Sequence, residues 1–106
     1  MLQTNPEKKH YELICVIVNS GLGSKVLGIA KRNGVSGGTI ILGRGTVHNR
    51  LLKLLELTDI RKEAVLMVAE KSLVRNTLEV IDAEIDFSKP NHGIGFVLPV
   101  GSFIGT

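Results

Sequence analysis

The run LICVIV at residues 13–18 decides the fold that we predict for this chain of 106 residues. Six consecutive apolar residues, most of them β-branched, are typical of a strand that is buried on both faces. Two further runs, AVLMVA (64–69) and IGFVLPV (94–100), have the same character. The three runs therefore predict a sheet that forms the centre of the domain.

Segments with helical spacing follow the first two runs. After the first run, apolar residues recur at helical intervals, at Leu22, Val26, Ile29 and Ala30. Gly34, which follows them, is a natural helix end. After the second run, Ser72 is the predicted N-cap of a longer helix. Its apolar residues fall at positions i, i+4, i+7 and i+11, which are Val74, Leu78, Ile81 and Ile85.

The chain thus repeats the order strand, helix, strand. One copy runs from 13 to 43 and ends in the second strand SGGTIILG (36–43), and the other runs from 64 to 100. We expect residues 1–10 to be a tail and 11–106 to be a single domain, with 44–63 as an insert of loop and short helix. Two βαβ halves in so short a chain predict an α+β, ferredoxin-like βαββαβ fold. Pro99 places the last strand at a sheet edge or bulge.

In this fold both helices cover the same face of the sheet. The runs 13–18 and 64–69 do not alternate apolar with polar residues, so their second face must also be buried. A second chain is the most direct way to cover it, because a free apolar face of this kind promotes association. The alternative is that the leucine-rich segment LLKLLEL (51–57) covers the face within one chain.

Composition argues against several classes of protein. The net charge is +3 with scattered cations and 4% aromatic residues, which does not indicate a nucleic-acid partner. The single Cys15 lies in an apolar run and is predicted to be buried. No stretch approaches the ~20 apolar residues of a membrane span, and no signal peptide is recognised, so we expect a cytoplasmic protein. The sequence shows no nucleophile with an adjacent base, so nothing in it indicates an enzyme.

Two segments resemble the PII nitrogen-regulatory proteins. SKPNHGIGFVLPV (88–100) is similar to the family's glycine-rich loop and closing FVLPV strand, and GVSGGTIILGRG (34–45) is similar to its second strand. The resemblance spans roughly 11–100 and implies a homotrimer with a central core of sheets. It also implies signal transduction without enzymatic activity. The effector, an adenine nucleotide, would bind in clefts between subunits, and the loop after the second strand would act on a transporter or enzyme.

The resemblance also implies roles for individual residues. Thr39 matches the strand threonine near the nucleotide, and Gly45 matches the glycine that opens the long loop. Lys89 and Gly93 match the lysine and the last glycine of the loop on the phosphate side. The remaining predicted effector residues stand where the family has an arginine, a glutamine and an aspartate, and they are His48, Asn49 and His92.

Other positions depart from the family's pattern. Ile94 replaces the phosphate-side lysine, Asn91 replaces the first glycine of that loop, and the chain ends GSFIGT without the family's arginines. A triphosphate would lose charge-assisted hydrogen bonds here, each worth roughly 1.5–3 kcal/mol. The loop that we expect to meet a protein partner contains Arg44, Arg50 and Leu54.

Two alternatives remain open on the sequence. One is a metal- or anion-responsive trimer like the CutA proteins of the same fold, in which His48 and His92 meet across an interface. Two histidines alone do not complete a metal site, which needs three or four ligands. The other alternative is an assembly module that binds no ligand.

Overall fold

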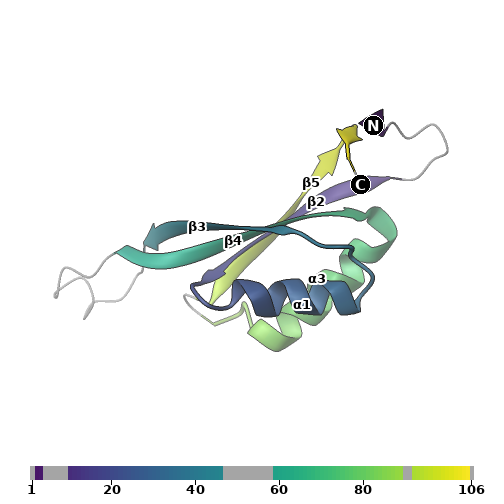
Figure 1. Cartoon of the computed structure of the whole chain (residues 1–106). Coiled ribbons are helices and arrows are strands. Elements are labelled where there is room, and N and C mark those ends of the chain that lie inside the picture. Colours follow the sequence, from purple (N-terminus) through teal and green to yellow (C-terminus); the bar gives the residue numbers. More distant parts are fainter. Residues whose placement is uncertain (1, 4–9, 47–58, 90–91, 106) are drawn as a thin grey trace.

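The structure is a computed structural model that describes residues 2–3, 10–46, 59–89 and 92–105. Figure 1 shows a sheet with two helices packed on one of its faces. The elements are β1 (Leu2–Gln3), β2 (Tyr11–Asn19), α1 (Gly23–Arg32), β3 (Thr39–Thr46), β4 (Asp59–Glu70), α3 (Lys71–Ile85), β5 (Gly93–Val100) and β6 (Phe103–Ile104). The main sheet is antiparallel with the strand order β3-β4-β2-β5. The predicted ferredoxin-like fold is confirmed.

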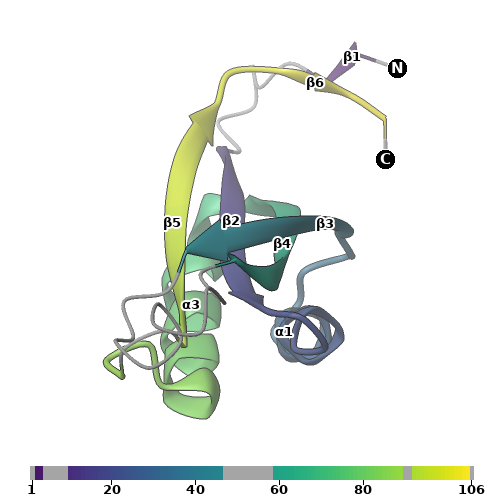
Figure 2. The ribbon, with the colours of Figure 1, turned by 90° about the vertical axis from the view of Figure 1, so that its left-hand side faces the viewer.

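The core lies between this sheet and the helices, which both lie on the same side of the strands in Figure 2. Alternate residues of β2 and β4 point into it and are fully or almost fully buried, namely Ile14, Val16, Val18, Val65 and Met67. From the helices come Val26, Ile29, Ala30, Val74, Ile81 and Ile85, with Leu78 packed against them. The helical spacing read from the sequence therefore identified the buried faces of both helices.

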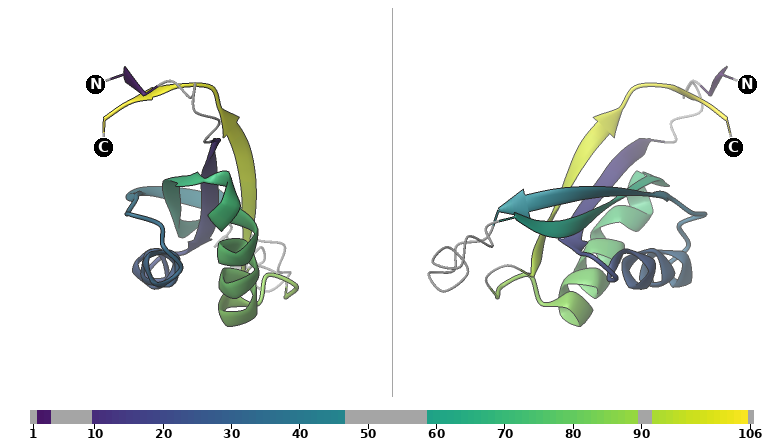
Figure 3. Two further views of the ribbon diagram at one scale, coloured as in Figure 1. Left: turned by 90° about the vertical axis from the view of Figure 1, so that its right-hand side faces the viewer. Right: turned by 60° about the vertical axis from the view of Figure 1, so that its left-hand side comes forward.

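Strands β3 and β4 are longer than the sequence indicated. The predicted insert 44–63 is shorter at both ends, because Arg44–Thr46 continue β3 and Asp59–Glu63 begin β4. These residues pair as an antiparallel ladder, with Thr46 opposite Asp59, so their polar character did not prevent strand formation. The hairpin extends past the helical layer as an arm, which we call the β3–β4 arm (Figure 3). LLKLLEL (51–57) lies outside the described residues.

Ser72 is not the N-cap of the second helix, as the sequence had suggested. α3 begins at Lys71 directly after β4, so Ser72 lies within its first turn and makes no cap. The amide of Lys71 donates a hydrogen bond of 2.7 Å to the carbonyl of His10 instead. Since this backbone bond satisfies one of the free amides at the helix start, one less donor needs a side-chain cap.

The ends of the chain meet beyond the main sheet. Within the predicted tail, Leu2 and Gln3 pair with Ile104 and Phe103. The rings of Tyr11 and Phe103 pack edge to face at 5.0 Å, a favourable aromatic geometry. Strand β5 lies at a sheet edge, which is where Pro99 was predicted to be tolerated.

The second face of the main sheet, which we call the open face, is also apolar. Neither helix packs on it, and its side chains include Ile41, Val68, Ile94, Phe96 and Leu98, each 39–57% exposed in the single chain. Cys15 lies at the centre of this face and is 7% exposed, so it is buried as predicted. Burial raises the pKa of its thiol. The prediction that the strands are apolar on both faces is confirmed.

Gly93, at the start of β5, provides a test of the sheet. Its φ is +143°, and a Cβ there would collide with the carbonyl oxygen of Ile17. We expect Gly93→Ala to lower the free energy of unfolding by about 1–3 kcal/mol. Gly43→Ala is the matched control, because a Cβ at Gly43 meets nothing within 4 Å. Urea denaturation at one protein concentration measures both, and equal stabilities of the two variants would contradict the strand register.

Candidate functional site

The described effector residues that the sequence predicted fall into two groups at opposite edges of the main sheet. Thr39 lies on edge strand β3, and Gly93 lies on edge strand β5. The row through Thr39 crosses Leu66 and Cys15 before it reaches Phe96. Three strand spacings separate the two edges by about 14 Å. One phosphate or carboxylate group therefore cannot contact both residues within a single chain.

The first group lies along β3, where a spacing of six residues places Thr39 about 20 Å from Gly45, so that only Gly45 lies at the base of the β3–β4 arm. Gly45 lies against the side chain of Lys62, and a Cβ at Gly45 would stand 2.9 Å from Cγ of that lysine. The Lys62 ammonium donates a hydrogen bond of 2.6 Å to Oδ1 of Asn19. Gly45 thus makes room for the lysine stem. The sequence did not indicate Lys62, because it was assigned to the insert and its position on a strand became visible only with the register of β4.

The second group is the loop between α3 and β5, which begins at Asp86 in the left-handed conformation with a φ of 61°. The Asp86 carboxylate accepts a hydrogen bond from the Ser88 hydroxyl and lies 3.6 Å from the Lys89 ammonium. His92 Nδ1 is 2.9 Å from the carbonyl of Ile85. Since that carbonyl can only accept, Nδ1 carries a proton. The loop therefore holds the Lys89 cation and the His92 ring near the end of α3, where positive charge is favoured.

Asp86 supplies a negative charge to this loop. The hydrogen bond from Ser88 is the main reason why the pKa of Asp86 lies below its ordinary value of 3.8. Desolvation is the second-largest effect and raises this pKa, whereas the nearby Lys89 ammonium, the backbone amide of Ser88 and the His92 ring each lower it further. An ionised Asp86 partly neutralises Lys89, so an anionic ligand at this loop competes with the carboxylate.

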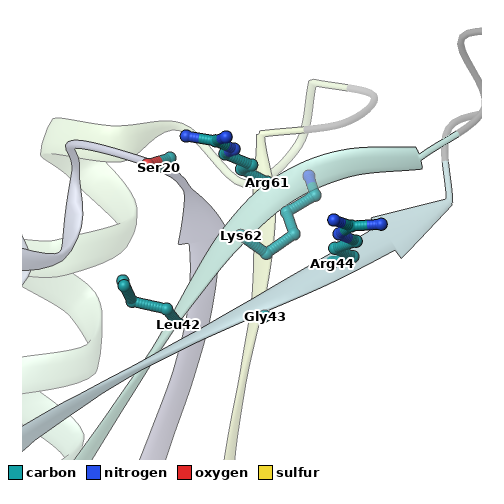
Figure 4. Close-up of a pocket in the computed structure, with 6 residues that line it drawn as sticks. All are labelled: Ser20, Leu42, Gly43, Arg44, Arg61 and Lys62. Carbon is teal, nitrogen blue, oxygen red and sulfur yellow. The ribbon is translucent and has the colours of Figure 1, made fainter.

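Two cavities lie near these groups. One, of about 290 Å³, lies at the base of the arm and is shown in Figure 4. It is lined by Ser20, Leu42, Gly43, Arg44, Arg61 and Lys62, of which the sequence indicated only Arg44 as a functional residue. The other, of about 420 Å³, lies between α3 and β5 and includes Gly93 with Leu78, Glu79, Asp82 and Phe87 in its lining.

Several predictions fall outside the described residues, namely those for His48, Asn49, Arg50 and Leu54. Among the residues that the structure does describe, no three His, Cys, Asp or Glu side chains gather as metal ligands. The metal-responsive alternative gains no support from this part of the chain. In the same part, no helix is both long and apolar enough to cross a membrane.

The Asp86 interaction gives a testable prediction. We expect the carboxyl carbon of Asp86 to titrate below 3.8 in NMR, and Ser88→Ala to move this pKa upward because the hydroxyl donor is lost. Since the folded-state pKa is lowered, the stabilisation is present above the unfolded-state value and is lost as pH falls through the folded-state value. Ser24→Ala, on the exposed face of α1, is the control. An unchanged Asp86 titration in Ser88→Ala would contradict the assigned cause.

Comparison with known proteins places this geometry in context. No protein-family model and no curated protein match the sequence. Among solved structures, PII of Arabidopsis thaliana bound to citrate is similar with a TM-score of 0.68 and 21% identity, over 91% of this chain and 82% of that one. CPII of Thiomonas intermedia K12, bound to ADP, AMP and acetate, is similar with a TM-score of 0.67 and 17% identity, over 100% of this chain and 93% of that one. The chain has the fold of the PII proteins.

Proposed function

We propose that this chain is a PII-like signal-transduction protein that forms a homotrimer in the cytoplasm. It senses a small effector, an adenine nucleotide, in the clefts between subunits and regulates a transporter or an enzyme through the β3–β4 arm and the loop that it carries. It performs no chemical reaction itself. The observation that carries this proposal is the apolar open face of a sheet that has the PII fold.

The open face supports association of identical chains. Fully burying a large apolar side chain contributes about 1.5–3 kcal/mol, and Ile94, Phe96 and Leu98 lie in a row on β5 alone. Ile41 and Val68 extend the same surface over β3 and β4. A surface of this kind on a small chain marks an interaction site. The face spans all four strands, so an assembly that buries it covers the whole side of the domain opposite the helices.

The positions of the predicted effector residues support a site between subunits. Thr39 and Gly93 lie on opposite edges of the sheet, so a single effector contacts both kinds of residue only if one subunit brings its β3 edge near the β5 edge of another. We assign the cleft residues accordingly as Thr39, Gly45, His48, Asn49, Lys89, His92 and Gly93. Effector binding then changes the position of one subunit relative to the next, and with it the position of the β3–β4 arm that leaves the cleft.

The choice of an adenine nucleotide rests on the similar structures. CPII is bound to ADP and AMP, and PII of Arabidopsis thaliana is bound to citrate. In this chain Lys89 supplies a cation to the loop between α3 and β5, whereas Ile94 supplies none. Since each lost cation removes charge-assisted hydrogen bonds, we expect the third phosphate of ATP to add no affinity over ADP.

A charged residue on the open face tests the assembly. We expect Phe96→Glu to convert the trimer to a monomer in size-exclusion chromatography with light scattering, because the carboxylate cannot be desolvated against a second chain. Leu42→Glu is the control, since Leu42 is 76% exposed and its register places it on the helix side of the arm. The control should remain a trimer. A wild-type monomer, or a Phe96→Glu trimer, would contradict this assembly.

Calorimetric titration with ADP, AMP and ATP tests the effector. We expect wild type to bind ADP, and Thr39→Val and Lys89→Gln each to weaken binding about tenfold, the loss of one hydrogen bond or charge pair. Lys25→Gln, an exposed lysine of α1, removes the same charge away from the cleft and should bind as wild type does. Absence of binding by all three nucleotides at millimolar concentration would exclude the nucleotide as effector.

A further inference from the structure

The ring of Phe87 lies across two glycines at the start of β5. A Cβ at Gly93 would stand 3.2 Å from Cε1 of the ring, and a Cβ at Gly95 would stand 3.4 Å from Cε2. Both glycines lie on the helix side of the strand, because they pair with Val18 and Val16, which are fully buried in the core. The two positions without side chains thus form a surface for the ring, which we call the glycine platform.

Phe87 attaches the loop between α3 and β5 to the body of the domain. Among the loop residues that the structure describes, 86–89 and His92, it has the only apolar side chain. Phe87 is half-buried and packs against the main core. Its amide donates a hydrogen bond of 3.2 Å to Oδ1 of Asp82. The amide therefore connects the loop to α3, and the ring connects it to β5.

The other contacts of the loop are polar. The ion pair between Lys89 and Asp86 joins side chains that are 65% and 43% exposed, and surface pairs of this kind contribute little. The amides of Lys89 and His92 donate backbone hydrogen bonds of 3.3 Å, which is longer than the usual range. Water competes for all of these groups. Burial of the Phe87 ring is therefore the main contact that gives the loop one position.

We propose that Phe87 is a positioning residue of the effector cleft, whose ring on the glycine platform holds Lys89 and His92 where they meet the effector. This role rests on the function proposed above. Lys89 follows Phe87 by two residues, and Gly93 directly follows His92, so the platform fixes the loop at both ends. The ring lies on the helix side, whereas Thr39 belongs to the row of the open face. Phe87 therefore acts through the loop rather than by contact with the effector.

The space beside the ring allows it to leave the platform. The cavity of about 420 Å³ between α3 and β5 is lined by Phe87 and by both glycines. Displacement of the ring into this space leaves the side chains of the core in place. A loop that occupies its binding position only about one-tenth of the time lowers the apparent affinity about tenfold. The packing of one ring thus sets effector affinity from outside the cleft.

Two substitutions remove this contact from opposite sides. Phe87→Ala deletes the ring, and Gly95→Val occupies the platform, because its methyl groups extend beyond a Cβ that already meets the ring at 3.4 Å. The φ of Gly95 is not positive and valine suits a strand, so the backbone tolerates this change. Val80→Ala is the matched control, since Val80 of α3 packs against the same core. Phe87→Leu keeps an apolar side chain on the platform.

NMR of the histidine rings measures the loop without an effector. In wild type, His92 should be in the tautomer that carries a proton on Nδ1, which donates to the Ile85 carbonyl. We expect the control and Phe87→Leu to retain this tautomer. The two variants that remove the contact should lose it, and their His92 ring should resemble that of the exposed His10. An unchanged tautomer in both variants, or an equal loss in the control, would overturn the proposed role of Phe87.

Calorimetric titration with ADP measures the effect on the cleft. We expect Phe87→Ala and Gly95→Val each to bind ADP about tenfold more weakly than wild type, and the control and Phe87→Leu to bind it as wild type does. Circular dichroism and light scattering check that all variants keep the fold and the assembly. A changed His92 tautomer with unchanged ADP affinity would also overturn the positioning role.

The two measurements separate this role from the proposed function. If wild type binds no nucleotide, the proposed effector fails and the positioning role fails with it. If wild type binds ADP but the His92 tautomer is the same in every variant, only the role of Phe87 fails, and the effector cleft stands.

Discussion

The main constraint on this protein is that two helices cover only one of the two apolar faces of its sheet. The covered face holds fully buried side chains such as Ile14 and Val65, whereas the open face leaves large side chains such as Ile94 exposed in a single chain. Covering such an apolar face lowers the free energy, and the gain grows with the area that is buried. In the proposed assembly, identical chains cover this face, and the edges of each sheet become the walls of clefts between subunits.

The β3–β4 arm follows from the same arrangement. β2 ends at Asn19, opposite Lys62, while β3 and β4 continue as a two-stranded ladder to the pair Thr46 and Asp59. The arm is thus anchored in the sheet at one end and free of the helical layer at the other (Figure 1). Isolated two-stranded ladders are only marginally stable.

Much of the fold was predictable from the sequence because its signals are local. The apolar run 13–18, the helical spacing of Val74, Ile81 and Ile85, and the edge position of Pro99 each follow from the chemistry of a short segment. The predicted cap at Ser72 is wrong, because the amide of Lys71 at the helix start bonds to the His10 carbonyl, a contact between residues far apart in the sequence.

The candidate sites were less predictable for the same reason. Arg44 was recognised within its loop, but its opposition to Arg61 depends on a strand register that extends into a polar segment with no apolar alternation. Lys62 became visible only through its contacts with Asn19 and Gly45. The separation of Thr39 from Gly93 likewise emerges from strand order rather than from either motif.

In the proposed assembly, the open face is buried against other copies of the chain. NMR of isoleucine methyl groups, with a soluble paramagnetic agent added, tests this most directly, because references for each environment are built into the chain. Ile14 and Ile29 are fully buried in one subunit, and Ile104 is 73% exposed. Ile94, which is 57% exposed in the single chain, should be protected from relaxation like Ile14 and Ile29. Relaxation of Ile94 as strong as that of Ile104 would contradict the account.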